Sequence, residues 1–298
     1  MANFSVGEAG QAVAWHPDAN QLVVAERTNL VIFDAELERN VRWVRDFAEK
    51  PTAVRFTRSG ATLVTGEHGA VRFWEFATGK LLAAVQGFPD FVHVFDLELS
   101  PDGARAFIAG SYGWAPVVDL ATASISFRCD VGEEEPEFEG AAWTADGQRV
   151  AAGEGAKVRI WGAGDGALEG TLDAGQGTVN WIRRTEDPSG LAVVTLNGQL
   201  AIVDAERRRV VRGFQIARGH VDSFVTAPDG KSAAVVDQSV RLISLEDGTE
   251  RWSIPPSALY RPKAAAFSKD GRQLAVVTAD GKLGIVDVAS GTLREPKA

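Results

Sequence analysis

A turn that recurs about every 42 residues is the feature of this sequence that most restricts its fold. Four strands of about six residues with four connections of about four fill a period of this length. Leucine-rich repeats are shorter, and TPR and ankyrin repeats need helical periodicity, which no repeat here shows. The sequence therefore predicts repeated four-stranded units. The aligned turn residues are Ala19, Gly60, Gly103, Gly147, Gly190, Gly230 and Gly271.

Residues suited to tight reversals separate the short apolar segments of each repeat. Pro101-Asp102-Gly103 and Pro228-Asp229-Gly230 are typical of the first turn, because Pro presets φ and Gly accepts a positive φ. Asn197-Gly198 favours a two-residue hairpin at the second turn. Apolar segments such as "LVVA" (22–25) and "LAVVT" (274–278) are expected to form inner strands buried on both faces.

Two further elements of the repeat are similar to a known family. Trp74-Glu75 and Trp161-Gly162 stand where the third strand of a repeat ends, and "SPDG" (100–103) forms a first turn. In these features the chain resembles the WD-repeat proteins, and the resemblance implies an all-β, seven-bladed β-propeller with four antiparallel strands per blade. We expect one domain spanning residues 1–298, with repeats at about 12–44, 53–85, 96–129, 140–172, 181–214, 223–254 and 264–293.

The hydrogen-bond network of the resembled family is incomplete in every repeat. That network needs a Gly-His before the first strand and a Trp at the end of the third. Gly219-His220 is the only such dipeptide, and its repeat carries Ile243 where the Trp belongs. Because one side-chain hydrogen bond contributes about 1 kcal/mol net, burial of apolar side chains is expected to hold the ring together without the network.

Closure of the ring calls for an outer strand in the last blade. Residues 4–15, "FSVGEAGQAVAW", align with residues 170–181, "GTLDAGQGTVNW", which places Phe4 to Val6 in a fourth-strand position. We therefore expect the N-terminal segment to complete the seventh blade. The alternative outer strand is "TLREP" at residues 292–296.

Composition narrows the possible partners and the compartment. A net charge of −9 is unfavourable for binding a phosphate backbone, so no nucleic-acid partner is expected. No apolar run reaches the roughly 20 residues of a membrane span, and the N-terminus lacks the features of a secretory signal. The single cysteine, Cys129, agrees with a reducing compartment. A cytoplasmic protein without membrane partners is expected, with Cys129 in the core.

Local catalytic motifs are absent from the sequence. "GAGDGA" (162–167) follows an apolar strand, but no helical segment comes after it to bind a pyrophosphate, so a turn is expected. His16, His68, His93 and His220 lack metal-ligand spacing, and we predict no cofactor, metal or catalytic residue. Side chains from different blades can still meet at a propeller's channel. A metal-assisted hydrolase or lactonase and a small-ligand sensor therefore remain alternative functions.

Aromatic residues gather in the connections between repeats. The loops at 86–96 and 255–263 are expected on the face that WD-repeat proteins use for partners, and aromatic residues with arginine are typical of interface anchors. We predict a non-catalytic platform that binds a protein or peptide near the central channel, as a monomer or within a larger complex. The candidate contact residues are Phe88, Phe91, His93, Tyr112, Trp114, Trp181, Tyr260 and Arg261.

Two charged segments add alternatives to this interface. "GEEEPEFEG" (132–140) carries five glutamates in one connection and is either a solvated loop or a docking patch for a basic partner. "ERRRVVR" (206–212) is expected at an outer hairpin on the opposite face, where its arginines either contact an acidic partner or form a solvated edge that is protected from strand addition.

Overall fold

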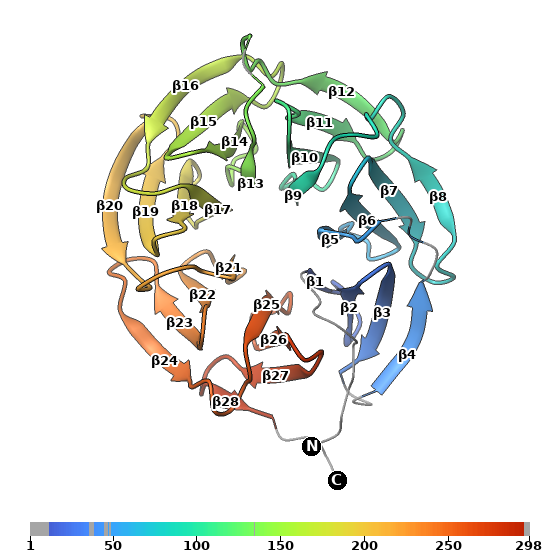
Figure 1. Ribbon diagram of the computed structural model, residues 1–298, viewed down its shortest axis with the longest axis vertical. Coiled ribbons are helices and arrows are strands. Elements are labelled where there is room, and N and C mark those ends of the chain that lie inside the picture. The colour runs from blue at the N-terminus through green and yellow to red at the C-terminus, as the bar shows by residue number, and fades with distance from the viewer. Residues whose placement is uncertain (1–11, 36–38, 45–46, 48, 134, 295–298) are drawn as a thin grey trace.

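The chain folds into a ring of seven blades. The computed structural model describes residues 12–35, 39–44, 47, 49–133 and 135–294. Over these residues there are seven four-stranded antiparallel sheets and no helix, and the sheets surround a central axis (Figure 1). The prediction of an all-β propeller with seven four-stranded blades is confirmed. The described residues accordingly include no helix of the length and apolar character needed to cross a membrane.

The strands follow chain order within each blade, from the channel outward. Their bounds, blade by blade, are β1 (Val13–Trp15), β2 (Gln21–Glu26), β3 (Asn29–Asp34) and β4 (Arg39–Val44); β5 (Ala53–Phe56), β6 (Thr62–Glu67), β7 (Ala70–Glu75) and β8 (Leu81–Ala84); β9 (Val94–Leu99), β10 (Arg105–Gly110), β11 (Pro116–Asp119) and β12 (Ser124–Arg128); β13 (Glu139–Trp143), β14 (Arg149–Glu154), β15 (Lys157–Gly162) and β16 (Leu168–Asp173); β17 (Val179–Arg184), β18 (Gly190–Thr195), β19 (Gln199–Asp204) and β20 (Arg209–Gln215); β21 (Ser223–Thr226), β22 (Ser232–Val236), β23 (Val240–Ser244) and β24 (Glu250–Ile254); β25 (Pro262–Phe267), β26 (Gln273–Thr278), β27 (Leu283–Asp287) and β28 (Thr292–Leu293).

Burial falls from the middle strands to the outer strand of a blade. Every residue of β18 is buried, whereas almost every residue of β20 is exposed. The hydrophobic clusters lie between blades, and each of them combines residues of two neighbouring blades, as Ile160 of the fourth blade and Ile182 of the fifth do. A middle strand contacts both adjacent blades, so the apolar runs of the sequence are buried on both faces.

The first turn of a blade brings its backbone close to the preceding blade. Gly230 has φ +67°, and a Cβ built on it would lie 2.3 Å from the amide nitrogen of Glu186, which belongs to the equivalent turn of the fifth blade. The Glu186 amide donates a 3.1 Å hydrogen bond to the Gly230 carbonyl. Both the positive φ and the close approach require glycine here.

The fifth blade departs from the aligned turn. Gly190 is the first residue of β18 and pairs with Asp204, and it is not among the glycines of positive φ. The turn itself comes from Asp187-Pro188-Ser189, since the Thr185 amide donates to the Gly190 carbonyl at 3.0 Å. The sequence alignment placed Gly190 in the turn because its spacing fits the period, although Pro188 and Ser189 already supply the reversal.

The first and last blades meet at a packed seam. The indole Nε1 of Trp15 in β1 donates to the carbonyl of Ala266 in β25 at 2.9 Å, and the two blades share a hydrophobic cluster. In the last blade, β28 pairs Thr292 and Leu293 with β27. The closing strand expected at residues 4–6 lies outside the described residues.

The tryptophans of the WD-like pattern serve in different contacts. The indole of Trp74 donates to the Thr65 hydroxyl at 2.9 Å within its blade, and the indole of Trp161 donates to the Asp130 carbonyl at 2.6 Å. His220 lies in an exposed connection, with its Nε2 4.0 Å from a carboxylate oxygen of Asp222. Cys129 is buried, and burial raises the pKa of its thiol to about 12.

Candidate functional site

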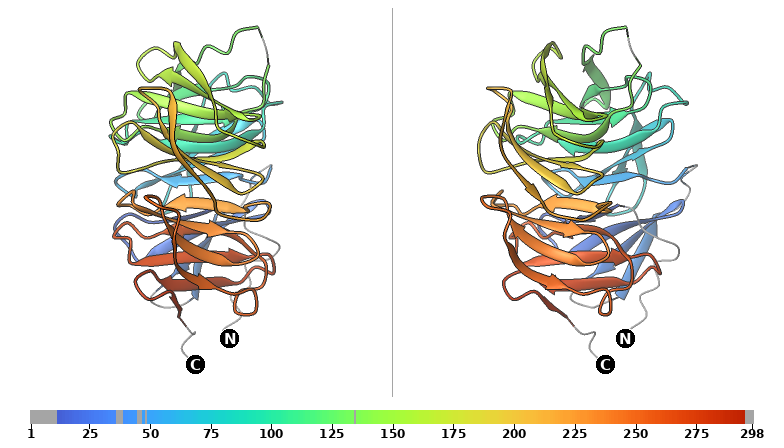
Figure 2. Two further views of the ribbon diagram at one scale, coloured as in Figure 1. Left: turned by 90° about the vertical axis from the view of Figure 1, so that its left-hand side faces the viewer. Right: turned by 60° about the vertical axis from the view of Figure 1, so that its left-hand side comes forward.

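The connections between blades and the second turns of the blades share one face of the ring, called here the loop face. Strands of a blade alternate in direction between the two faces, so the entry to the first strand and the turn between the second and third lie at the same end (Figures 1 and 2). At the third blade these segments bond to one another. The Ser111 amide donates to the His93 carbonyl at 3.0 Å, and the Gly113 amide donates to the Pro136 carbonyl at 2.7 Å.

Four rings of the candidate set form two pairs on this part of the loop face. Phe91 and Tyr112 meet edge to face with ring centroids 5.6 Å apart, and they are 54% and 49% exposed. The ring centroid of Phe88 lies 5.5 Å from that of Trp114, and both side chains are partly buried. Phe88 packs against the core cluster between the second and third blades. Phe88 and Trp114 therefore support the loops, while Phe91 and Tyr112 face solvent.

His93 extends the exposed rings toward the channel. Its ring stacks on that of His68 with centroids 4.0 Å apart, and its centroid lies 6.3 Å from that of the Phe95 ring. Phe95 is exposed and lines the channel. We call Phe91, His93, Phe95 and Tyr112 the aromatic patch. It joins three predicted residues with Phe95, which was not among the candidates although the predicted loop at 86–96 includes it; in the structure Phe95 belongs to the first strand of the blade, β9.

The acidic connection borders the aromatic patch. Glu133, Glu135 and Glu137 are exposed, and the Gly113–Pro136 hydrogen bond ties their loop to the turn that carries Tyr112. The fully buried ring of Phe138 anchors the loop, with its centroid 5.4 Å from that of Trp161. Burial and the neighbouring Glu137 raise the pKa of Glu139 at the end of the loop.

The other predicted contact residues lie elsewhere on the ring. Trp181 is partly buried in the fifth blade, and its indole donates to the Val221 carbonyl at 3.1 Å. Tyr260, which is 60% exposed, and the exposed Arg261 stand on the loop between the sixth and seventh blades. The structure therefore brings together the residues of the second and third blades and leaves these three apart from them.

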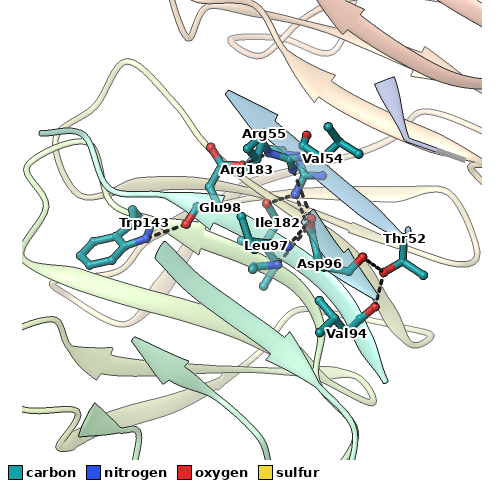
Figure 3. A network of polar contacts seen from close by, with 12 residues as sticks. Thr52, Val54, Arg55, Val94, Asp96, Leu97, Glu98, Trp143, Ile182 and Arg183 are labelled. Carbon is teal, nitrogen blue, oxygen red and sulfur yellow. Dashed lines mark hydrogen bonds and ion pairs between the residues drawn. The ribbon is translucent and has the colours of Figure 1, made fainter. Parts of the chain in front are cut away.

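A network of ion pairs, which the sequence reasoning missed, lies inside the channel. One oxygen of the Asp96 carboxylate accepts from Arg183 at 2.7 Å and the other from Arg55 at 3.2 Å (Figure 3). Arg55 also donates to Glu98 at 3.1 Å. Burial by itself would raise the pKa of Asp96, but Arg183, Arg55 and the amide of Ala141 outweigh burial and hold that pKa below its usual value.

These charges occupy one repeated position. Arg55, Glu98 and Arg183 each stand two residues before the residue that opens the first turn, which is Thr57, Ser100 or Thr185. The same offset carries apolar residues in the other four blades. Comparing the first strands position by position would therefore have revealed the network as three charged residues in an otherwise apolar layer. The apolar members of the layer are Ala14, Ala142, Val225 and Ala266.

The structure also places the metal-ligating residue types and the glycine-rich segment that the sequence analysis considered. Within the described residues, no group of three or more His, Cys, Asp or Glu side chains is placed to hold a metal ion. Gly162 to Leu168, which covers the glycine-rich segment, makes the turn from β15 into β16, closed by a 2.9 Å bond from the Gly166 amide to the Gly162 carbonyl.

No protein-family model matches the sequence, and no curated protein is similar to it in sequence. The WD-repeat identity accordingly remains a resemblance, and the propeller fold rests on the strand topology.

Proposed function

We propose that this protein is a non-catalytic, cytoplasmic interaction platform that binds a basic segment of a protein partner on the loop face of the second and third blades. Aromatic residues are enriched at interfaces, tyrosine is among the residues that most often dominate the binding energy, and cations are attracted to the faces of such rings. The aromatic patch supplies the rings, and Glu133, Glu135 and Glu137 supply the opposite charge beside it. This juxtaposition is the observation that carries the proposal.

The backbone of Tyr112 supports a binding role for its ring. Tyr112 has φ +55°, a conformation that costs a residue with a Cβ about 1 kcal/mol. Its side chain is half exposed, so burial returns little of this cost. Strained residues gather at functional sites, where another requirement maintains them. Asparagine, which adopts this conformation at lower cost, would suit the turn better if the turn were its only role.

Capture of partners from the native cell, with wild type and variants as bait, tests the proposal. Phe91→Ala/Tyr112→Asn should lose the bound partner while the melting midpoint stays the same or rises. Tyr260→Ala is the matched control, because it removes an exposed ring from another part of the loop face. Retention of every partner by the double variant, or loss with Tyr260→Ala alone, would contradict the choice of surface.

Neutralising the acidic loop tests the charge of the partner. Glu133→Gln/Glu135→Gln/Glu137→Gln should release the captured partner at lower salt than wild type does, because screened attraction to these carboxylates is lost. An elution profile identical to that of wild type would show that the partner is not held by its basic charge.

A further inference from the structure

A cavity of about 820 Å³ runs along the channel, and the residues of the ion-pair network form part of its lining. The first strands of six blades line it, and it continues to the first turns on the face opposite the loop face, where Pro17, Pro101 and Pro228 stand at its edge. Its volume falls within the roughly 300–1,000 Å³ that small-molecule sites in proteins span.

The wall of this cavity is divided between charged and apolar side chains. On the charged side, the repeated layer described above contributes Arg55 from the second blade, Glu98 from the third and Arg183 from the fifth. Ala14, Val225 and Ala266 represent the first, sixth and seventh. A molecule in the channel would therefore meet charge on one side and hydrocarbon on the other.

The charged wall keeps hydrogen-bond donors that the carboxylates do not use. Arg183 is about nine-tenths buried, and it bonds through Nη1 to Asp96 and to the Ile182 carbonyl. Among the described residues, its Nε and Nη2 have no acceptor, and Arg58 makes no hydrogen bond or ion pair. The Nη2 of Arg184 lies 3.8 Å from a carboxylate oxygen of Glu98, and the Arg184 side chain is 41% exposed.

The charges of this wall leave one cation uncompensated. Of the described residues that line the cavity, those without an ion-pair partner outside it are four cations, Arg55, Arg58, Arg183 and Arg184, and three carboxylates, Asp96, Glu98 and Asp229, so the cluster carries +1. At the edge of the cavity, Lys269 pairs with Asp18 at 2.8 Å and Glu186 pairs with Lys231 at 3.3 Å. Asp229, also at the edge, accepts from the Lys231 amide in its own turn.

We propose that the channel cavity binds a small organic acid with one carboxylate and an apolar body. A single negative charge balances the cluster, and a guanidinium offers a carboxylate two parallel donors. The head lies between Arg183 and Arg184 and the body against Ala14, Val225 and Ala266. A dianion would leave excess charge in the channel, and a neutral molecule would leave the arginine donors unused.

Titration calorimetry with acetate, butyrate, 4-phenylbutyrate and decanoate tests this site on the full chain. Affinity should rise with the size of the acid's apolar body, with one molecule bound per chain. The alcohol 4-phenylbutanol should bind at least about tenfold more weakly than 4-phenylbutyrate. Inorganic phosphate, a head without a body, should show no saturable binding. If none of the acids saturates the protein at millimolar concentration, or the alcohol binds as well as its acid, the site does not exist as described.

Two conservative variants connect the binding to the channel. Arg184→Gln and Arg58→Gln should each weaken the binding of 4-phenylbutyrate by about tenfold, because each removes one cation from the cavity lining. The fold should stay intact, because neither residue belongs to the close ion pairs. Arg251→Gln on the exposed face of β24 is the matched control for charge and should bind as wild type does. Phe91→Ala should also leave binding of the acid unchanged, since Phe91 does not line the cavity. Equal affinity in Arg184→Gln, Arg58→Gln and Arg251→Gln would mean that the acid binds elsewhere.

Discussion

At the scale of single residues, Asp96 is the carboxylate that pairs with two arginines of the channel, Arg55 and Arg183. Asparagine has the same shape but no charge, so Asp96→Asn leaves Arg183 and Arg55 short of a counter-charge. Removing one member of a buried ion pair costs about 3–5 kcal/mol, and the partial exposure of Arg55 favours the lower end of that range. Urea unfolding at pH 7 should show a loss of about 3 kcal/mol. A loss below about 1 kcal/mol would mean that Asp96 is no more than a surface ion pair.

The same residue predicts how stability depends on pH. The pKa of Asp96 is lower in the folded protein than in the unfolded chain. A depressed pKa contributes stability at pH values above the unfolded pKa of about 3.9, and this contribution is lost as the pH falls through the folded value. The difference in free energy of unfolding between wild type and Asp96→Asn should therefore be constant from pH 7 to about 5 and shrink below about pH 4. A difference that stayed constant to pH 2 would contradict this assignment.

At the scale of elements, the first turns separate two reasons for glycine. Gly230 and Gly271 hold the same turn position with φ +67° and +70°. A Cβ on Gly230 would lie 2.3 Å from the Glu186 nitrogen, whereas one on Gly271 would meet nothing closer than Pro228 Cδ at 3.4 Å. Gly271→Ala should therefore lower the free energy of unfolding by about 1 kcal/mol, because only the positive φ is unfavourable for alanine there. Gly230→Ala should cost at least about 1 kcal/mol more, because two blades must shift apart. Equal melting midpoints for the two variants would show that the close approach carries no energy.

The elements also show why the fold was predictable and the channel was not. Turn residues and buried middle strands act locally, so their spacing indicated seven four-stranded blades. Gly190 shows the limit of spacing, because Pro188 and Ser189 moved the turn without changing the period. The Asp96 network joins residues 41 and 87 positions apart. Its contacts exist only after the ring forms, so no pattern within one repeat marks them, and only a comparison of the first strands across repeats shows the charged positions. For the loop face, the sequence supplied the candidate residues, but only the structure separated exposed Phe91 from supporting Phe88.

At the scale of the whole molecule, the seam between the first and last blades differs from the other junctions in chain connectivity. Trp15 in β1 donates to Ala266 across 251 positions, whereas Trp143 in β13, at the matching strand position, donates to Glu98 across 45. Both indoles are buried, so Trp15→Ala and Trp143→Ala should each cost about 3–5 kcal/mol. Their effects on the ring should differ. The loop from β12 to β13 keeps the third and fourth blades adjacent when their packing weakens, while in the described chain the seam has only noncovalent contacts.

Amide hydrogen exchange distinguishes the two variants. Local opening of the seam requires no unfolding of the remaining blades, so its free energy should fall below the global value in Trp15→Ala. We expect the amides of β1, β2, β25 and β26 to exchange faster than the rest of the ring in that variant. In Trp143→Ala protection should decline evenly, because the flanking blades remain linked through a short loop and reclose rapidly. An even decline in both variants would mean that the seam opens only when the whole propeller unfolds, held either by its packing or by the closing strand expected at residues 4–6.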